Sequence, residues 1–267
     1  MKAPDFAYAR PSSLAEALDL LAQPGAKVLA GGQSLIASLN LRLSSPDLLV
    51  DITGLKDLSG IEVGNASVRI GALVTHAQLE RSADVRKHLP LLAEAVPHVA
   101  HAAIRNRGTL GGSLALADPA AEYPACAVAL EAVIHISGKR GERRVGAESF
   151  FKGLFETDLQ PGEILAAVEF PAAKPADRWA FQELARRQGD YATIGLAAHN
   201  ARFVFFGAGS TPVYVGEISV RDSLSKAKEI LSNTLQPPAD LYHSSATKRH
   251  LAGVLLERAW NTLTTSR

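Results

Sequence analysis

The chain has 267 residues, of which 47% are hydrophobic, so it is long enough to bury a substantial core and to form more than one domain. Its net charge of +1 argues against a nucleic-acid partner, and its single cysteine, Cys126, excludes an internal disulfide or an iron–sulfur cluster held by this chain alone. No apolar run approaches the length of a membrane span, and the first residues lack the apolar region of a signal peptide, so we expect a cytoplasmic protein without a membrane span.

The first predicted elements are a helix, a strand and a second helix. Ser13 and Glu16 have the spacing of a capping box and mark the start of the first helix. Lys27–Ala30 is a short apolar strand that runs directly into the loop Ala30–Ser34, and Gln33–Leu43 has the leucine spacing of a helix that leaves this loop. The loop is therefore a strand-to-helix turn, where backbone amides favour an anion.

The next part of the chain predicts strands followed by helices. We expect a buried strand at Leu48–Ile52 and an alternating strand at Ser67–Ala72. Thr75–Gln78 repeats the capping pattern for another helix. A further helix over Val85–Val96 is interrupted at Pro90.

A glycine turn is predicted at Thr109–Ser113. Gly111 and Gly112 lack a Cβ, so the backbone can adopt a positive φ and another molecule can approach its amides closely. Together with the hydroxyls of Thr109 and Ser113, such amides suit a phosphate group. A tight turn between strands explains either this segment or Ala30–Ser34 alone, but the two together could clasp one diphosphate. Neither segment is a P-loop or a dinucleotide fingerprint.

The rest of the chain predicts an α+β arrangement, with strands followed by helices. Because Pro171–Asp177 has the composition of a linker, we place a domain boundary there. The predicted elements are a helix at Pro124–Leu130, a hairpin of Val133–Ile136 and Arg143–Val145, strands at Glu163–Phe170, Ala180–Arg186, Ile194–His199 and Phe203–Phe206, and helices marked by Leu224–Leu235 and Leu251–Trp260.

No arrangement of a nucleophile with a base is recognisable, so we predict no catalytic residue. Metal-ligand spacing is also absent from the histidines of the first half, and we predict no metal site. These are His76, His88, His98 and His101. A cofactor must therefore supply any redox chemistry. Two interpretations remain: a flavoprotein subunit of a larger oxidoreductase, or a nucleotide-diphosphate binding module without redox chemistry.

Four motifs in a defined order identify a family. They are AGGQSL at 30–35, IRNRGTLGGS at 104–113, ADPAAE at 117–122 and GDYA at 189–192. In order and spacing they resemble the flavin subunit of the molybdenum hydroxylases, a family that includes bacterial carbon monoxide dehydrogenase and the FAD domain of xanthine dehydrogenase. The resemblance runs from Phe6 to about Trp260, which is nearly the whole chain.

The fold that this resemblance implies is α+β and has two parts. Residues 1–174 would form an FAD-binding domain of the vanillyl-alcohol oxidase type, with two lobes at about 1–55 and 56–174. Residues 175–267 would form a C-terminal α+β domain with a three-stranded sheet and helices.

The resemblance also implies FAD as the cofactor of this chain. The two glycine segments would wrap the diphosphate and the ribityl chain, and Glu122, which is usually aspartate in relatives, would hold a cofactor hydroxyl. Tyr191 would lie over the flavin ring, Leu165 beside the flavin and Val99 beside the adenine, although ordinary core packing explains Leu165 and Val99 equally well. The implied cofactor-binding residues are Ala30, Gly31, Gly32, Gln33, Ser34, Leu35, Val99, Thr109, Gly111, Gly112, Ser113, Glu122, Leu165 and Tyr191.

Finally, the resemblance implies a multi-subunit complex. A large subunit would carry the molybdenum cofactor and a small subunit would carry 2Fe–2S clusters, arranged as a dimer of heterotrimers. This chain would accept electrons from those clusters and pass them to an external acceptor. The alternative with a similar fold is a stand-alone flavin reductase that acts on an enolpyruvyl sugar.

Overall fold

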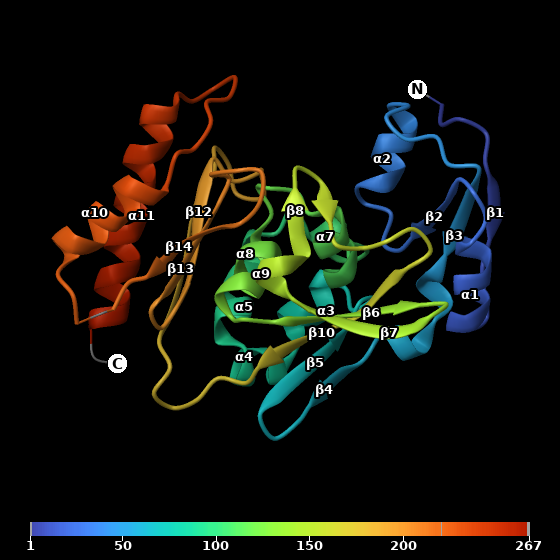
Figure 1. Cartoon of the computed structure of the whole chain (residues 1–267), viewed down its shortest axis with the longest axis horizontal. Helices are drawn as coiled ribbons and strands as arrows, with labels where there is room; N and C mark the ends of the chain where they lie inside the picture. The colour runs from blue at the N-terminus through green and yellow to red at the C-terminus, as the bar shows by residue number, and fades with distance from the viewer. Residues whose placement is uncertain (1, 220, 266–267) are drawn as a thin grey trace.

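The N-terminal part of the chain forms a three-stranded parallel sheet in the order β1–β3–β2 (Figure 1). We describe a computed structural model that covers residues 2–219 and 221–265. The elements of this first part are β1 (Ala7–Ala9), α1 (Leu14–Leu21), β2 (Ala26–Leu29), α2 (Leu35–Asn40) and β3 (Leu48–Asp51). Because both neighbours of β3 run parallel to it, the carboxyl ends of all three strands lie at one edge of the sheet.

The start of α1 confirms the predicted cap only in part. The Glu16 amide donates a hydrogen bond to the Ser13 hydroxyl, as a capping box requires. The Glu16 carboxylate, however, accepts hydrogen bonds from the amide and hydroxyl of Ser12 instead of the amide of Ser13. The second helix is also shorter than predicted, because α2 ends at Asn40 and Arg42 has a left-handed φ of 57°.

A five-stranded antiparallel sheet, in the order β4–β5–β10–β6–β7, forms the middle of the molecule. Its strands are β4 (Ile61–Val63), β5 (Ser67–Gly71), β6 (Val133–Gly138), β7 (Gly141–Gly146) and β10 (Ile164–Pro171), and a separate hairpin joins β8 (Phe151–Gly153) to β9 (Glu156–Thr157). The helices of this part are α3 (His76–Arg81), α4 (Ala83–His88), α5 (Pro90–Ala95), α6 (Ala102–Arg105), α7 (Leu110–Leu116), α8 (Glu122–Ala129) and α9 (Ala147–Phe150). Residues of α5, α7 and α8 share one hydrophobic core with this sheet.

Caps and proline confirm two helix boundaries in the middle part. At the start of α3, the Gln78 amide donates to the Thr75 hydroxyl and the Thr75 amide donates to the Gln78 side chain, which completes the predicted capping box. At the predicted interruption, α4 ends at His88 and α5 begins at Pro90. Proline has no amide hydrogen to donate to the preceding turn, so the helix restarts there.

The C-terminal part contains a four-stranded antiparallel sheet, one strand more than predicted. β11 (Trp179–Leu184), β12 (Ile194–His199) and β13 (Arg202–Phe206) occupy the predicted positions, and β14 (Val213–Glu217) is the additional edge strand. In β14, Gly216 has a φ of 96°, and its pairing with β13 shifts register between Arg202 and Val204. An irregular strand of this kind lacks the regular alternation by which strands are recognised in a sequence.

Two layers of helices enclose the C-terminal sheet (Figure 1). α10 (Leu224–Thr234) and α11 (Ser245–Thr264) cover one face, while α5 and α8 cover the other. Alternate residues of β12 serve the two faces: Leu196 and Ala198 pack with α10 and α11, and Ala197 packs in the core that contains α8. The C-terminal part is thus joined to the middle part through hydrophobic core, and the boundary at 174/175 stays a prediction.

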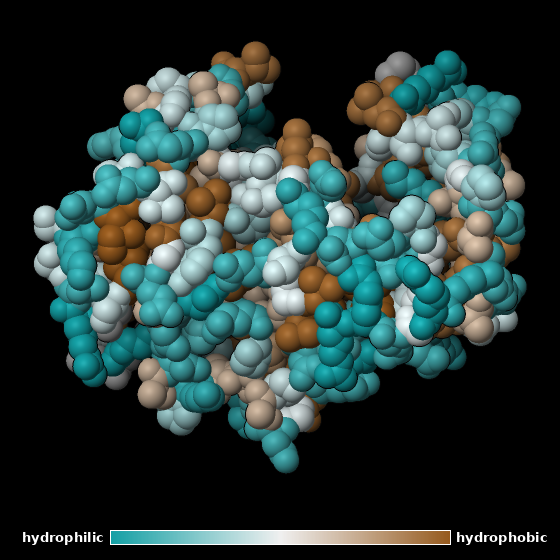
Figure 2. All heavy atoms as spheres, in the orientation of Figure 1, coloured by the Kyte–Doolittle hydropathy of each residue, from teal (hydrophilic) through white to brown (hydrophobic). Residues whose placement is uncertain are grey.

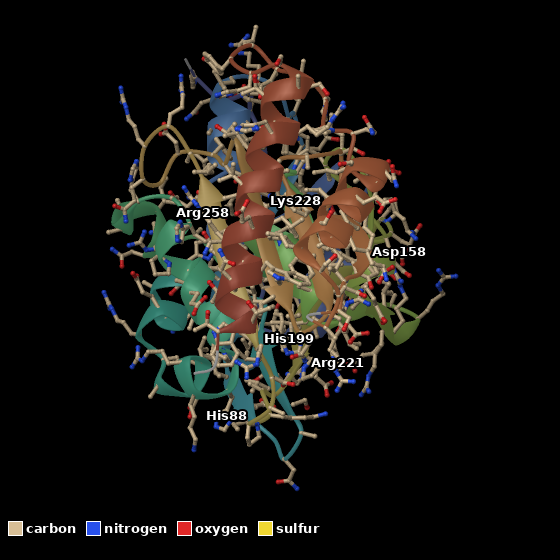
Figure 3. All side chains as sticks on the ribbon, turned by 90° about the vertical axis from the view of Figure 1, so that its left-hand side faces the viewer. His88, Asp158, His199, Arg221, Lys228 and Arg258 are labelled. Carbon is tan, nitrogen blue, oxygen red and sulfur yellow. The ribbon has the colours of Figure 1, made fainter. Side chains whose placement is uncertain are left out.

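Figure 3 looks onto the outer helical layer, where Lys228 of α10 forms an ion pair with Glu257 of α11 at 2.7 Å. Within residues 2–219 and 221–265, no helix has both the length and the apolar character that crossing a membrane requires.

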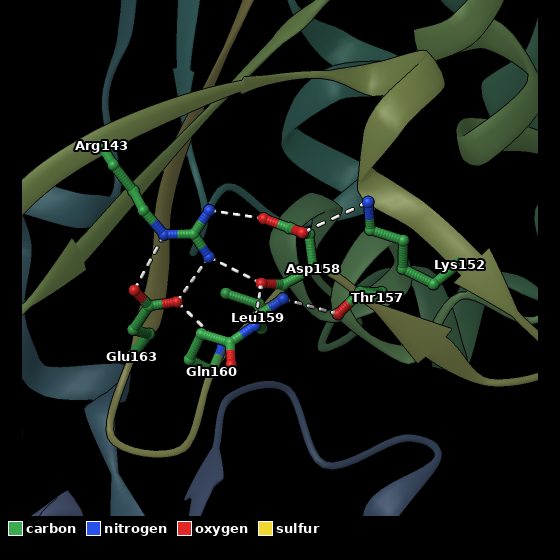
Figure 4. Close-up of polar contacts among 7 residues, drawn as sticks. All are labelled: Arg143, Lys152, Thr157, Asp158, Leu159, Gln160 and Glu163. Carbon is green, nitrogen blue, oxygen red and sulfur yellow. Dashed lines mark hydrogen bonds and ion pairs between the residues drawn. The ribbon is translucent and has the colours of Figure 1, made fainter.

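A charged cluster around Arg143 holds the loop that leads into β10 (Figure 4). The Arg143 guanidinium donates to the carboxylates of Asp158 and Glu163, and Lys152 also lies 3.3 Å from Asp158. The hydrogen bonds from Arg143 lower the pKa of both carboxyl groups. The network therefore ties β7 to the segment that immediately precedes Leu165.

We expect the substitution Arg143→Met to lower the free energy of unfolding by about 1–2 kcal/mol at pH 7, because it removes charged hydrogen bonds that are partly exposed. Since the two carboxyl pKa values are lowered by folding, their contribution is present at neutral pH and is lost as the pH falls towards about 3. Urea unfolding at pH 7 and pH 3 measures both effects. Arg140→Met, at the exposed turn of the same hairpin, is the control, and an equal loss at both pH values would contradict this role of the network.

Candidate cofactor-binding site

A cavity of about 400 Å³ lies against the first glycine loop. The space-filling view shows the molecule hollowed along its upper edge, next to the end that carries α2 (Figures 1 and 2). The cavity-lining residues come from the end of β2, the loop after it, α2, the segment after β3, and the segment before α7. They are Leu29, Ala30, Gly31, Gly32, Gln33, Ile36, Ala37, Asn40, Asp51, Thr53 and Arg107. Four of the predicted cofactor-binding residues thus line this cavity.

The first glycine loop presents backbone donors that the fold does not use. In the part of the chain that the structure describes, the amides of the five residues from Gly31 to Leu35 donate no hydrogen bond. Gly32 has a φ of 75°, a conformation that residues with a Cβ adopt rarely. Unpaired amides in such a turn create a site for an anion. This segment is therefore a strand-to-helix turn with free amides, as its sequence predicts.

The second glycine segment differs from the predicted turn, because α7 begins inside it. Thr109 is the N-cap of this helix, and neither Gly111 nor Gly112 has a positive φ. The amides are also already paired: Leu110 donates to the Val74 carbonyl, Gly111 to the Ala72 carbonyl, and Gly112 to the Thr109 hydroxyl. The expectation of a run of free amides at this segment is therefore wrong. In the described chain, the Thr109 amide and the Ser113 hydroxyl are the groups of this segment that stay without a partner.

Gly111 is required by packing inside the protein. A Cβ at this position would lie 2.4 Å from the Cβ of Ala72, which is itself buried. The missing side chain allows α7 to approach the end of β5 closely, which is also why the Gly111 amide reaches the Ala72 carbonyl. Gly111 is thus explained by the fold of the chain, and a contact of Thr109–Ser113 with the cofactor stays a prediction.

The two glycine segments nevertheless lie side by side. A Cβ on Gly31 would lie 2.1 Å from the Arg107 carbonyl oxygen and 2.9 Å from the Cα of Gly108, so the two backbones are in direct contact. Gly108 immediately precedes Thr109, which also pairs with Thr75 in an isolated β-bridge. The two segments are therefore close enough to form the predicted clasp, although a run of free amides occurs only in the first of them.

Glu122, Asp118 and Tyr191 come together from α8, the turn before it and the loop after β11. Burial and, to a smaller extent, the charge of Asp118 raise the pKa of the Glu122 carboxyl to about 7. Partial burial of the Tyr191 hydroxyl raises its pKa, and the carboxylates of Asp118 and Glu122 add to this effect. The Tyr191 residue is nevertheless 73% exposed, so its ring is available for contact with a ligand.

Val99 and Leu165 lie in the hydrophobic core of the middle part. Val99 follows the short helical turn Val96–His98, and Leu165 lies on β10. They are only 8% and 4% exposed, so core packing accounts for both residues. Their predicted positions beside the adenine and the flavin stay predictions.

Several residues at the cavity are absent from the sequence-based prediction. Asp51 ends β3, and its carboxylate accepts hydrogen bonds from the Tyr8 hydroxyl and from the amide and hydroxyl of Thr53. Because β2 and β3 are parallel, the end of β3 lies beside the loop that follows β2. Had the sequence analysis predicted that these two strands pair in parallel, it would have placed Asp51 beside the loop.

Among the described residues, no group of three potential metal ligands occurs.

Glu183 is a further buried carboxyl group at the seam between the middle and C-terminal parts. Its side chain is 3% exposed, its Oε2 accepts no hydrogen bond in the described chain, and the nearest basic group is His98 Nδ1 at 3.7 Å. Burial raises the pKa of Glu183 to about 8, and the charge of Glu122 contributes. Burial also lowers the pKa of His98, so the imidazole is neutral at pH 7 and does not compensate a negative charge.

We expect Glu183→Gln to make the protein more resistant to alkaline pH. The Glu183 pKa is raised from 4.5 to about 8 in the folded state, so the wild type loses stability as the pH rises through this window. The amide cannot ionise, and the variant should therefore be more stable than the wild type by on the order of 1–3 kcal/mol at pH 8.5, with little difference at pH 5. Thermal unfolding across this pH range is the measurement, with the exposed Glu142→Gln as control. A difference that is independent of pH would refute the assignment of a buried neutral carboxyl.

Comparisons with known proteins agree with this geometry. Residues 4–173 match the family model described as the FAD binding domain in molybdopterin dehydrogenase. The 6-hydroxypseudooxynicotine dehydrogenase complex subunit alpha of Paenarthrobacter nicotinovorans is 37% identical, over 97% of this chain and 94% of that protein. The carbon monoxide dehydrogenase medium chain of Hydrogenophaga pseudoflava is 34% identical, over 97% of this chain and 96% of that protein.

Solved structures extend this similarity to the whole fold. Carbon monoxide dehydrogenase from Hydrogenophaga pseudoflava superposes with a TM-score of 0.93 at 32% identity, covering 98% of both chains. Quinoline 2-oxidoreductase from Pseudomonas putida 86 superposes with a TM-score of 0.92 at 36% identity, covering 99% of this chain and 98% of that chain. The chain therefore belongs to the family of FAD-binding subunits of the molybdopterin dehydrogenases, which are oxidoreductases, as its four motifs predict.

Proposed function

We propose that this chain is the electron-transferring FAD subunit of a molybdenum hydroxylase complex. The observation that carries the proposal is the cavity beside five unpaired backbone amides, in a chain that matches the FAD-binding family. FAD contains a diphosphate, which needs several hydrogen-bond donors and little steric obstruction. The loop Gly31–Leu35 offers both, because its amides are free and its first two residues have no side chain.

The remaining predicted residues also fit the chemistry of FAD. Glu122 presents a carboxyl group that can accept a hydrogen bond from a cofactor hydroxyl, and Tyr191 presents an exposed aromatic ring that can cover a flavin. The charge of Glu122 contributes to the raised pKa of Tyr191. Ser113 adds a hydroxyl on the first turn of α7.

When bound, FAD supplies the redox chemistry, because it can take up electrons from iron–sulfur clusters and release them to an external acceptor. The residues of this chain hold and orient the cofactor. Glu122 can hold or release a proton at its carboxyl oxygen near neutral pH, because burial raises its pKa to about 7. The exposed ring of Tyr191 would shield one face of a bound flavin from water.

The proposal includes partner subunits. Relatives are named as subunits of complexes, such as the medium chain of carbon monoxide dehydrogenase and the medium subunit of nicotine 6-hydroxylase. We infer a large subunit with the molybdenum cofactor and a small subunit with 2Fe–2S clusters, in a dimer of heterotrimers that acts in the cytoplasm. The comparisons give no support to a stand-alone enolpyruvyl-sugar reductase or to a binding module without redox chemistry.

We expect the purified chain to bind FAD in a 1:1 ratio and Gly32→Val to weaken this binding at least tenfold. A β-branched residue at a φ of 75° strains the turn and redirects its amides, while the unfolding free energy falls only by about 1–2 kcal/mol. Flavin fluorescence titration and thermal unfolding measure the two effects. Gly146→Val is the matched control, because Gly146 has ordinary backbone angles and open space around it.

Either of two results would contradict the FAD site. One is a wild-type chain that takes up no FAD from solution. The other is a Gly32→Val variant that retains full affinity.

Co-purification tests the partner subunits separately. We expect an affinity-tagged chain, expressed in its own host, to bring down one larger and one smaller protein, with molybdenum and iron detected in the complex by elemental analysis. The two metals must come from partners, because this chain has a single cysteine and it is buried. Isolation of a flavin-containing monomer that reduces an enolpyruvyl sugar would overturn the subunit assignment.

A further inference from the structure

Arg107 is the only positively charged residue among the described residues that line the cavity. Its side chain is exposed, and its guanidinium forms no hydrogen bond or ion pair within the described chain. The neighbouring Arg105 behaves differently, because it donates to the Glu80 carboxylate and to the carbonyls of Val99 and Ala100. Arg105 therefore has a structural role, and Arg107 is free to meet a ligand.

The backbone of Arg107 is held firmly against the first glycine loop. The Arg107 amide donates to the Ile104 carbonyl at 3.0 Å, and the Gly108 amide donates to the same carbonyl at 2.7 Å. On its other side the Arg107 carbonyl contacts Gly31, where no side chain would fit. The flexible side chain of Arg107 therefore starts from a fixed point directly beside the free amides of the loop.

The acidic residue of the cavity does not neutralise this arginine. Asp51 is the only acidic residue among the described residues that line it. One of its carboxylate oxygens accepts from the Tyr8 hydroxyl, and the other accepts from the amide and hydroxyl of Thr53. These bonds hold the Asp51 carboxylate in the wall of the N-terminal part. It forms no ion pair with Arg107 in the described chain, so the guanidinium stays available for an anion.

We propose that Arg107 binds the diphosphate of FAD together with the Gly31–Leu35 amides and makes affinity depend on the diphosphate charge. This inference rests on the proposed FAD site and adds a residue that the four-motif resemblance does not assign. It follows from the paired state of the amides of Leu110, Gly111 and Gly112, which leaves the second half of the clasp with far fewer free backbone donors than the first. A guanidinium supplies planar paired donors for phosphate oxygens, which restores that half.

The test compares three ligands that share parts of FAD. FAD and ADP contain the diphosphate, whereas riboflavin contains the flavin ring and ribityl chain alone. We expect Arg107→Gln to weaken FAD and ADP about 10- to 100-fold, as the loss of a charged hydrogen-bond pair implies, and to leave riboflavin within about twofold. Arg107→Lys keeps the charge without the paired donors and should fall between the two.

Flavin fluorescence titrations and calorimetry with ADP give the affinities of the full-length chain, and each is repeated at low and high salt. The affinity of the wild type for FAD should fall with salt more steeply than that of Arg107→Gln, because screening weakens the charge contact. Arg140→Gln is the matched control, an exposed arginine with no ion pair in the described chain and outside the cavity lining. Thermal unfolding establishes that all variants are folded.

The outcomes separate the two proposals. A wild type that binds neither FAD nor ADP overturns the FAD site and this inference with it. A wild type that binds FAD, with Arg107→Gln binding it equally well, overturns the role of Arg107 alone. An equal loss of riboflavin affinity would likewise overturn it, because a diphosphate contact cannot affect a ligand without phosphate.

Discussion

The contact between the backbone of Gly31 and that of Arg107 and Gly108 is the constraint on which the site depends. It joins the N-terminal lobe to the middle part at a distance that no side chain on Gly31 would permit. This contact places the strand-to-helix turn beside the segment that leads into α7. Because the turn is occupied by this packing on one side, its free amides are left for the cavity on the other. A larger residue at this position would separate the two halves of the clasp.

Electrostatics at the seam follow from the same architecture. The C-terminal sheet packs through hydrophobic core onto α8, and this apolar layer contains the carboxyl groups of Glu122 and Glu183. Removal from water disfavours the charged form of a carboxyl group, and two such groups near one another disfavour it further. The protein therefore keeps proton-holding groups with pKa values near neutrality close to the predicted position of the flavin. Perturbed groups of this kind are concentrated at functional sites.

Glycine is required for different physical reasons in the two glycine segments of this chain. Motif matching alone does not distinguish these reasons. Gly31 and Gly32 permit a close backbone contact and a positive φ in a turn whose amides are free. Gly111 permits a helix to pack on Ala72 and has its amide satisfied there. Family resemblance assigns both pairs to the same cofactor, and this assignment of the two pairs stays a prediction. That the first segment has free amides while Gly111 of the second packs inside the protein is decided by the packed structure.

The sequence by itself determined the family, the α+β class and most of the local elements. The Thr75 cap, the proline at 90 and the alternation of polar and apolar residues in β5 act over a few residues, so their effect is readable without the fold. Only the tertiary structure decided that Thr109–Ser113 opens a helix, that β14 joins the sheet, and that Asp51 and Arg107 reach the cavity. These features depend on contacts between residues far apart in the chain, such as Gly111 with Ala72 and Gly31 with Arg107. Local patterns contain no information about such contacts, and the burial that shifts the pKa of Glu183 is likewise created only when the C-terminal sheet packs against α5 and α8.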